Sequence, residues 1–295
     1  MGKSGFVTLC GRPNVGKSTL VNRLVGSKVA ITSPRPQTTR NRIIGVMTKP
    51  EVQIVFIDTP GIMKEKSQLN KRMVEASTEA GAGCDFAFFM TDADRQDIEA
   101  DRYALKRLGK LKAPCFLVIN KIDLVKKVQL LKLIEQLTSL ADFAEVFPIS
   151  AKTGENVDSL VRCVEERMPD GPMFYPSDMI TDQPEKFFIG EIVREKAFLF
   201  LSQELPYSTA VMVERLVDRN NGVTAISAVI YVERKSQKGI VIGKGGAMLK
   251  KIGSSARIEL EKILGVKVFL ELHVTIKEKW TGNERSLSDL GYRRE

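Results

Sequence analysis

The chain has 295 residues, of which 43% are hydrophobic and 27% charged, a composition typical of globular protein with one large or two ordinary domains. A formal net charge of +9 at pH 7 favours an acidic partner, either nucleic acid or an anionic membrane surface. The sequence contains no run of about 18 apolar residues and no signal-peptide core, so we expect a cytoplasmic protein without a transmembrane segment. The four cysteines lie far apart without a C-x-x-C pair, which argues against a zinc cage or a disulfide framework.

Short apolar runs alternate with longer amphipathic segments in the first part of the chain. The runs predicted as strands cover residues 6–10, 43–47, 52–57, 86–90, 115–119 and 146–149. Strands that alternate with helices predict a doubly wound, mostly parallel α/β sheet. We therefore predict a first domain over residues 1–170.

Four prolines between residues 169 and 184 interrupt the periodicity and predict a linker over residues 171–184. Beyond it, the pattern predicts a helix over 187–205, strands over 210–217 and 224–232, a helical segment over 246–264 that is broken near Gly253, and a strand over 267–276. This αββααβ order predicts a small α+β domain over residues 185–295.

A phosphate-binding motif directly follows the first predicted strand. Residues 11–18 fit the pattern G-x-x-x-x-G-K-S/T and lead into a helix-like segment. The glycines let the backbone wrap phosphates, Lys17 reaches the β- and γ-phosphates, and the Ser18 hydroxyl ligates Mg²⁺. The predicted nucleotide-binding residues here are Gly11, Arg12, Pro13, Asn14, Val15, Gly16, Lys17, Ser18 and Thr19.

A second motif, Asp58-Thr59-Pro60-Gly61, closes the apolar run 52–57. Its aspartate is positioned to hold the Mg²⁺ shell, and the N–H of Gly61 can sense the γ-phosphate. Because ligands bind open α/β sheets at the carboxyl ends of the strands, we predict that this motif shares a site with the phosphate-binding loop.

Two further segments at strand ends indicate that the base is guanine. The Asp123 carboxylate can accept two hydrogen bonds from guanine that adenine cannot offer, while Asn120 and Lys121 buttress the base. After the next strand, the N–H of Ala151 can donate to the guanine O6. The residues predicted to bind the base are Asn120, Lys121, Asp123, Ser150, Ala151 and Lys152.

These motifs resemble those of the translation-factor-related GTPases, and three later segments narrow the family. They are F-x-x-E-I-x-R-E-K at 188–196, E-L-P-Y-S at 204–208 and V-I-G-K-G-G-A-M-L-K-K-I-G at 241–253. With them, the chain resembles the bacterial Era GTPase family over essentially its full length. The resemblance implies a P-loop GTPase domain that uses GTP, GDP and Mg²⁺, a type II KH domain, and a role in assembling the 30S ribosomal subunit by binding the 3′ end of small-subunit (16S) ribosomal RNA.

The resemblance also places a first switch segment at residues 36–40, which contain two adjacent threonines. It implies Thr39 as the second hydroxyl ligand of Mg²⁺, with Thr38 as the alternative. The predicted metal ligands are thus Ser18, Thr39 and Asp58.

Hydrolysis is expected to be slow, because Ile62 stands where Ras-like GTPases keep a glutamine that orients the attacking water. Catalysis would then depend on Lys17, Thr39 and Gly61 together with Mg²⁺, and on a group supplied by a partner or by an ion. Similarity to related GTPases implies that Asn14 helps to hold a potassium ion whose charge acts like an arginine finger; alternatively, Asn14 only stabilises the loop.

A second glycine-rich stretch, residues 239–253, misses the spacing of the phosphate-binding motif and has Gly245 where the Mg²⁺-binding hydroxyl would be. Its segment 243–246 instead fits G-x-x-G, the KH loop that clamps about four nucleotides of single-stranded backbone. Apolar residues around it, predicted to form a wall for the bases, are Ile240, Val241, Ile242, Leu249 and Ile252. The predicted RNA-binding residues are Arg234, Lys235, Lys238, Gly243, Lys244, Gly245, Gly246, Lys250 and Lys251.

The tail carries Trp280 near Lys277, Lys279 and Arg285. This tryptophan either extends the RNA surface by stacking or packs the end of the domain.

The leading hypothesis is a monomeric GTP-driven switch that binds ribosomal RNA. The second is a constitutive RNA-binding adaptor with a non-catalytic G domain, against which the intact Lys17, Ser18, Asp58 and Asp123 argue. The third is peripheral association with the cytoplasmic face of the inner membrane, which the positive charge allows although no amphipathic or lipidated anchor is evident.

Overall fold

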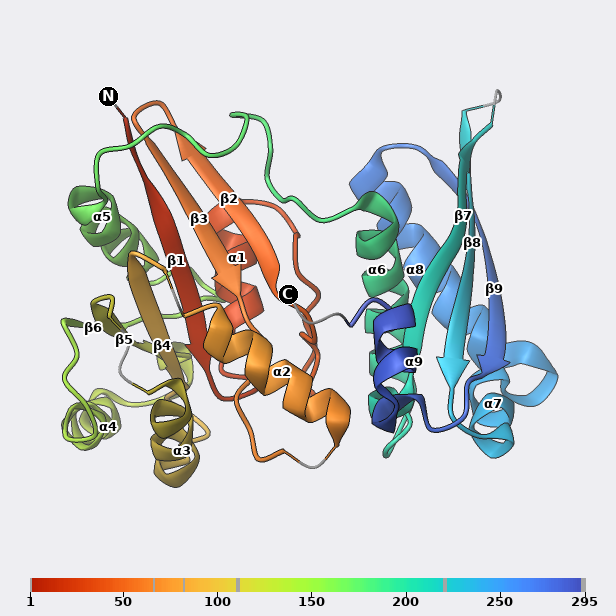
Figure 1. The fold of residues 1–295 in the computed structure, drawn as a ribbon, viewed down its shortest axis with the longest axis horizontal. Coiled ribbons are helices and arrows are strands. Elements are labelled where there is room, and N and C mark those ends of the chain that lie inside the picture. Colours follow the sequence, from red (N-terminus) through yellow and green to blue (C-terminus); the bar gives the residue numbers. More distant parts are fainter. Residues whose placement is uncertain (1, 66, 82, 110–111, 220–221, 293–295) are drawn as a thin grey trace. The chain divides into compact units, whose positions relative to one another are not determined.

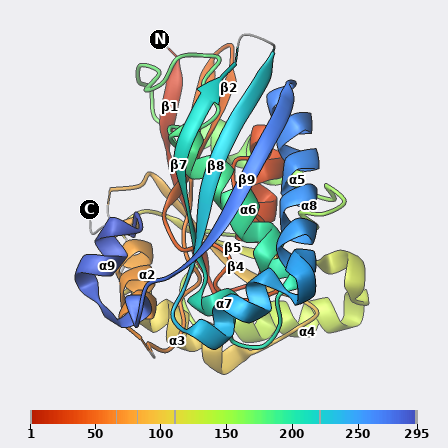
Figure 2. The same cartoon turned by 90° about the vertical axis from the view of Figure 1, so that its right-hand side faces the viewer.

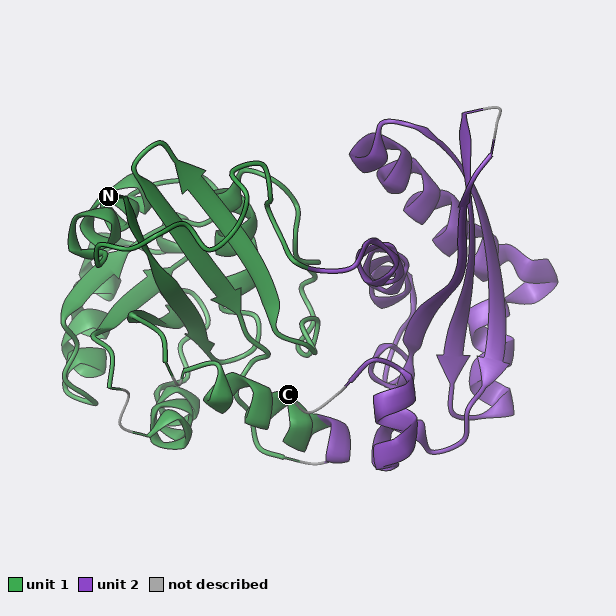
Figure 3. Cartoon of the chain, turned by 45° about the horizontal axis from the view of Figure 1, so that its top comes forward, with its two compact units in different colours: residues 1–66, 70–182, 295 green, residues 67–69, 183–294 purple. Residues whose placement is uncertain are grey.

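The computed structural model describes residues 2–65, 67–81, 83–109, 112–219 and 222–292. It divides into two compact units (Figure 3). Among the described residues, 2–65 and 70–182 form the first unit, and 67–69 with 183–292 form the second. Each unit is described by itself below.

The first unit is built on a six-stranded sheet in the order β2-β3-β1-β4-β5-β6 (Figure 1). The pairing of β2 with β3 is antiparallel and the other pairings are parallel, which confirms the predicted doubly wound, mostly parallel sheet. The strands are β1 (Lys3–Gly11), β2 (Ile43–Lys49), β3 (Val52–Asp58), β4 (Phe86–Asp92), β5 (Cys115–Asn120) and β6 (Glu145–Pro148).

Helices connect these strands, and two hydrophobic clusters pack them against the sheet. One cluster joins the sheet to α1 and α5 through residues such as Leu20 and Leu160, and the other joins it to α3 and α4 through Ala104 and Leu133. Every residue of β3 and β4 is buried, as expected of parallel strands covered on both faces. The helices are α1 (Lys17–Val25), α2 (Gln68–Glu79), α3 (Ile98–Leu108), α4 (Lys127–Thr138) and α5 (Val157–Arg167), with a 3₁₀ turn η1 (Ile122–Leu124).

Much of the predicted linker packs on the first unit. The buried Gln53 side chain accepts hydrogen bonds from the N–H groups of Phe174 (2.7 Å) and Tyr175 (2.9 Å). Farther along, the N–H of Val46 donates to the carbonyl of Ile180. The division between the units therefore comes at the end of this linker, after Asp182, because residues 174–180 are bonded to strands of the first sheet.

The second unit has a three-stranded sheet in the order β7-β8-β9, seen face-on in Figure 2. Strand β8 pairs antiparallel with β7 and parallel with β9. Its elements are α6 (Glu185–Phe200), β7 (Ala210–Asp218), β8 (Val223–Val232), α7 (Lys235–Ile242), α8 (Ala247–Leu264), β9 (Lys267–Ile276) and α9 (Glu284–Asp289), with 3₁₀ turns η2 (Pro206–Ser208), η3 (Lys244–Gly246) and η4 (Trp280–Gly282). The order αββααβ from α6 to β9 confirms the predicted small α+β domain.

Two predicted helix limits are wrong. Helix α6 ends at Phe200 rather than near residue 205, because Leu201 is already extended. Helix α8 runs unbroken through Gly253, and the interruption lies instead at residues 243–246. Gly243, Gly245 and Gly246 all have positive φ, whereas Gly253 lies inside the helix beside Leu272, where its lack of a side chain serves close packing.

None of the described helices is both long and apolar enough to cross a membrane.

Candidate functional site

The loop between β1 and α1 carries the predicted phosphate-binding residues. Gly11 and Gly16 have φ of 136° and 102°, and a Cβ on either would lie about 2 Å from Met90 or Asn120 atoms respectively. Lys17 lies buried beneath this loop, where its Nζ donates to the carbonyls of Gly11 (3.3 Å) and Arg12 (2.9 Å). Burial lowers the pKa of Lys17 to about 8, despite the opposing effect of the nearby Asp58 carboxylate.

The three predicted metal ligands converge beside this loop. The Ser18 hydroxyl donates to Oδ2 of Asp58 (2.6 Å) and lies 2.8 Å from the Thr39 hydroxyl, which is itself 3.4 Å from Asp58 Oδ2. The Asp58 side chain is fully buried, and burial raises its pKa to about 6. Within the described part of the chain its Oδ1 has no hydrogen-bond partner. A buried, under-satisfied carboxylate beside two hydroxyls is an oxygen donor set that suits Mg²⁺.

The neighbouring Thr38 is engaged elsewhere. Its hydroxyl lies 2.7 Å from that of Ser33 and donates to the carbonyl of Arg35 (2.8 Å). Of the two adjacent threonines, the geometry therefore brings Thr39 to Ser18 and Asp58.

Asn120 ties the predicted phosphate-binding loop to the segment at residues 150–152 that is predicted to bind the base. Its Nδ2 donates to the carbonyl of Val15 (2.8 Å), and its Oδ1 accepts from the N–H of Ala151 (2.8 Å). This N–H of Ala151, which is predicted from the sequence to donate to the guanine O6, here satisfies the oxygen of the buried Asn120 amide. Asp123 lies exposed in the turn η1.

The remaining predicted base-binding residues are fixed by neighbours. Lys121 forms an ion pair with Asp92 at the end of β4. The Ser150 hydroxyl accepts from the N–H of Thr153 (3.1 Å). Arg23 on α1, which no motif includes, donates to the carbonyls of Ala151 and Lys152 and holds this loop in place.

Several motif residues have structural partners. The Thr59 hydroxyl donates to the Leu9 carbonyl (2.7 Å), and the Pro60 carbonyl accepts from Ser77 (2.7 Å). The Arg12 guanidinium is directed to Asp101 on α3 (2.6 Å) rather than to the pocket. Ile62 is 2% exposed, and its N–H donates to the Gly11 carbonyl, so this residue cannot orient a water molecule.

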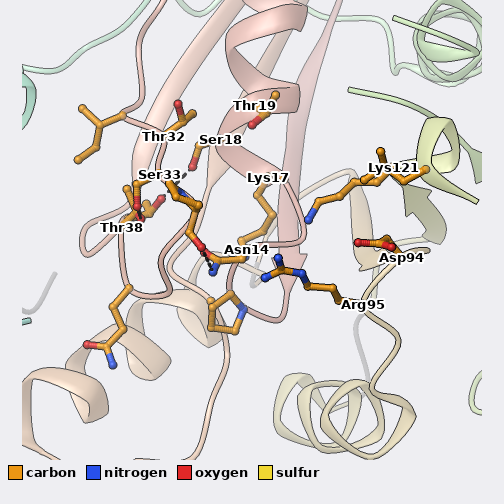
Figure 4. A pocket seen from close by; sticks show the side chains of 18 residues that line it. Asn14, Lys17, Ser18, Thr19, Thr32, Ser33, Thr38, Asp94, Arg95 and Lys121 are labelled. Carbon is orange, nitrogen blue, oxygen red and sulfur yellow. Dashed lines mark hydrogen bonds between the residues drawn. The ribbon is translucent and has the colours of Figure 1, made fainter. Parts of the chain in front are cut away.

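These segments surround a pocket of about 270 Å³ (Figure 4). Predicted residues in its lining are Pro13, Asn14, Gly16, Lys17, Ser18, Thr19, Thr39, Gly61 and Lys121, together with Thr38. The Asn14 Nδ2 donates a hydrogen bond to the Pro34 carbonyl (3.0 Å), two residues before the first switch segment. Gln37 of the first switch segment also lines the pocket, and lining residues that the sequence did not indicate are Ile31, Thr32, Ser33, Pro34, Asp94, Arg95 and Leu124. The position of Asp94 and Arg95 at the end of β4, the same sheet edge as the motifs, is the signal that could have found them.

The second glycine loop is the turn between α7 and α8. Its backbone φ values are 75° at Gly243, 59° at Gly245 and 80° at Gly246, and Lys244 is exposed at its tip. Beside it lies a groove of about 350 Å³ between α8 and β9, lined by Gly246, Leu249, Lys250, Gly253, Ser254, Arg257, Leu270 and Leu272. The loop and Lys250 thus border one groove, while the Lys251 ammonium lies over the Phe200 ring of α6 (4.4 Å to the centroid). The other basic residues lie on or next to α7, Arg234 and Lys235 exposed at its start and Lys238 half-buried.

The predicted apolar wall is partly wrong. Val241 and Ile252 are fully buried in the core, because α7 and α8 turn these faces inward. The groove is walled instead by Leu249 of α8 and by two leucines of β9, Leu270 and Leu272. Alternation along β9 places both leucines on the helix-facing side, a pattern visible in the sequence.

Trp280 packs the end of the domain and does not offer a stacking surface. It is fully buried, its indole N–H donates to the Ser208 carbonyl (3.0 Å), and its ring stacks on Tyr292 with centroids 5.7 Å apart. Nearby, Lys277 pairs with Asp289 (2.9 Å).

Comparison with known proteins agrees with this geometry. Residues 6–121 match a family model described as a 50S ribosome-binding GTPase, and residues 204–281 match a KH domain model. The chain is 51% identical to GTPase Era of Geobacter metallireducens over 291 residues, 98% of either chain. It is 49% identical to GTPase Era of Lacticaseibacillus paracasei over 289 residues, 98% of this chain and 96% of that one.

Two solved structures cover the same architecture. One is Era in complex with MgGDPNP and nucleotides 1506–1542 of 16S ribosomal RNA, with a TM-score of 0.95, 39% identity and coverage of 100% of both chains. The other is a point variant of Aquifex aeolicus Era bound to GDP and AlF4⁻, with a TM-score of 0.94, 39% identity and coverage of 99% of this chain and 100% of that one. The chain therefore belongs to the Era family and is a GTPase with a C-terminal KH domain.

Proposed function

We propose that this GTPase binds 16S ribosomal RNA near its 3′ end through the KH domain and assists assembly of the 30S subunit. The observation that carries the proposal is the pairing of the pocket at Lys17 with the groove beside residues 243–246 in one chain. A relative of the same architecture holds MgGDPNP together with nucleotides 1506–1542 of 16S ribosomal RNA.

In the proposed mechanism, Ser18, Thr39 and Asp58 hold Mg²⁺, and Thr39 rather than Thr38 supplies the second hydroxyl, because it already lies 2.8 Å from Ser18. When bound, Mg²⁺ neutralises charge on the β- and γ-phosphates. Lys17 reaches the same phosphates from beneath the loop, where its low solvent exposure strengthens the attraction. The backbone N–H groups at the start of α1 face the anion.

We propose that specificity for guanine resides in the exposed carboxylate of Asp123, with Asn120 and Lys121 holding its loop. Asn120 joins the base segment to the phosphate loop through its two 2.8 Å hydrogen bonds. Guanine offers two adjacent donors to a carboxylate, and adenine does not.

We propose slow intrinsic hydrolysis with potassium as the missing positive charge. Ile62 is buried and cannot position water, whereas Asn14 lies at the pocket, where its amide donates to the Pro34 carbonyl just before the first switch segment. Equal hydrolysis rates in potassium and sodium buffers of matched ionic strength would exclude this role for the ion.

On the RNA side, the turn at residues 243–246 lets backbone approach phosphate, and the leucines of the groove offer apolar contact to unstacked bases. Lys250 adds positive charge to the lining of the groove, Lys244 adds it at the exposed tip of the turn, and Arg257 also lines the groove but is paired with Glu261. Phosphate contacts from these residues would make the affinity depend on salt.

The testing experiment is crosslinking of the full chain to cellular RNA with GTP or with GDP, followed by sequencing. Enrichment of the 3′ end of 16S ribosomal RNA is expected, greater with GTP, and it should disappear in a Gly245→Asp variant that still binds GTP. Random RNA, or recovery with membrane lipid instead of RNA, would overturn the proposal and favour peripheral membrane association. Equal RNA recovery with GTP and with GDP would favour the constitutive RNA-binding adaptor over the GTP-driven switch.

A further inference from the structure

Arg95, in the loop between β4 and α3, reaches the nucleotide pocket although it lies outside every sequence motif described above. It lines the pocket together with Asn14, Lys17 and Lys121. Figure 4 shows the Arg95 guanidinium pointing toward Asn14 of the phosphate-binding loop.

The backbone of Arg95 is held from both sides. Its N–H donates to Oδ1 of Asp92 (3.1 Å), which also accepts from the N–H of Asp94 (2.9 Å). Its carbonyl accepts from Nη2 of Arg12 (3.1 Å), whose Nε is anchored on Asp101 (2.6 Å). The phosphate-binding loop and α3 therefore fix the point from which the Arg95 side chain extends.

Asp92, which accepts the Arg95 N–H, also pairs with Lys121 at the pocket. Its side chain is 4% exposed, and its Oδ2 pairs with the Lys121 ammonium while Oδ1 holds the Arg95 loop. One buried carboxylate thus pairs with the Lys121 ammonium and fixes the backbone of Arg95 beside the pocket.

The Arg95 guanidinium itself is exposed, and no hydrogen bond or ion pair holds it to another side chain of the described residues. A guanidinium presents several N–H donors in a planar fork that matches phosphate oxygens. The ligand expected in this pocket is a polyphosphate, next to Lys17.

We infer that Arg95 is a further nucleotide-contacting residue, whose guanidinium binds phosphate oxygens of GDP and GTP from the side of the β4–α3 loop. The inference rests on the proposed assignment of this pocket to the phosphates. It gives the site a cation that comes from neither the phosphate-binding loop nor a partner protein.

The test compares Arg95→Gln and Arg95→Lys with wild type by calorimetric titration of GDP and of a non-hydrolysable GTP analogue with Mg²⁺. Arg95→Gln should bind both nucleotides about tenfold more weakly, because a charge-assisted hydrogen bond is lost. The affinities of Arg95→Lys should lie between those of wild type and Arg95→Gln, since lysine keeps the positive charge but lacks the planar fork of N–H donors. The difference between Arg95→Gln and wild type should shrink at high salt.

The matched control is Arg102→Gln on the neighbouring helix α3, an exposed arginine whose partner is Glu99 (3.5 Å). Thermal unfolding without nucleotide checks that all variants fold alike. Affinities of Arg95→Gln within twofold of those of Arg102→Gln would overturn the inference. A Lys17→Ala variant tests the assignment of the pocket separately from the role of Arg95. If Lys17→Ala and Arg95→Gln both bind nucleotide like wild type, the assignment of the pocket to the phosphates is wrong. If only Lys17→Ala loses binding, the pocket assignment holds and the role of Arg95 is wrong.

Discussion

The two glycine loops of this chain begin helices in the same way and yet form different sites. Helices α1 and α8 are both preceded by a glycine in the left-handed region, Gly16 and Gly246, with no side-chain cap. In the first loop the lysine is buried below the turn, whereas Lys244 in the second is exposed at the tip.

The surroundings account for the difference. A Cβ on Gly16 would collide with Asn120, while Cβ atoms on Gly245 and Gly246 would meet nothing within 4 Å. The first loop is therefore enclosed by other strand ends and has a carboxylate and two hydroxyls beside it; the second is open and borders an apolar groove. In both loops, glycine next to lysine indicates a site that approaches phosphate. Whether the loop is enclosed by neighbouring strand ends or open to solvent then decides whether a compact triphosphate or an extended nucleic-acid strand fits.

The largest effect is expected from Lys17→Ala, which removes the buried ammonium of the first loop. GTP and GDP should bind about a thousandfold more weakly, since a charge in a water-poor site interacts strongly with phosphate. Calorimetric titration measures the affinities. Lys244→Ala, the equivalent change in the second loop, should leave them unchanged; similar losses in both variants would abolish the distinction between the loops.

Asp123→Asn should be next in size. It exchanges a carboxylate that accepts two hydrogen bonds for an amide, so GTP affinity should fall about a hundredfold. Xanthosine nucleotides should gain affinity, because xanthine offers an acceptor where guanine has its amino group. Competition between GTP and XTP measures the preference, and an unchanged preference for GTP would show that the base lies elsewhere.

Gly245→Asp should act on the second loop alone. The space around Gly245 is open, and aspartate tolerates the left-handed φ of 59° better than most side chains do, so the fold should persist at a modest cost in stability while a negative charge enters the proposed RNA path. RNA affinity should fall about twentyfold by filter binding. Nucleotide affinity should stay at the wild-type value, and RNA binding equal to wild type would mean that the turn does not contact the backbone.

Lys250→Ala should have the smallest effect, a few-fold loss of RNA affinity, because it removes one phosphate contact at the edge of the groove. The slope of log affinity against log salt should become shallower by about 0.7 for single-stranded RNA. Lys251→Ala is the control, since that ammonium lies over the Phe200 ring. Equal salt slopes for wild type and Lys250→Ala would contradict the assignment.

The sequence predicted local features well, because their information is contiguous. The loop over residues 11–18 needs a fixed spacing after a strand and before a helix, and the strand-end positions of Asp58 and Asn120 follow from the rule that parallel strands share one ligand-binding edge. The two sheets and the αββααβ order followed from hydrophobic periodicity in the same way.

What the sequence missed depends on contacts between distant residues. Arg23 meets the loop at 151–152 only after folding, and Arg95 lines the same pocket as Asn14 only because β4 lies beside β1. The bond between Asn120 and Ala151 likewise depends on the pairing of β5 with β6. Trp280 could be placed only once Ser208 and Tyr292 were known to lie against it.

The contact between Gly16 and Asn120 has a consequence for the speed of nucleotide exchange. The amide lies where a Cβ on residue 16 would be and bonds both to Val15 and to Ala151, so protein groups rather than the nucleotide hold the phosphate and base segments together. Association then requires no ordering of these loops, and its rate should be close to that of a preformed site. The same contact constrains both positions: a side chain at 16 would displace the amide of residue 120 as well as strain the backbone at a φ of 102°, and a smaller residue at 120 would lose the bonds to Val15 and Ala151.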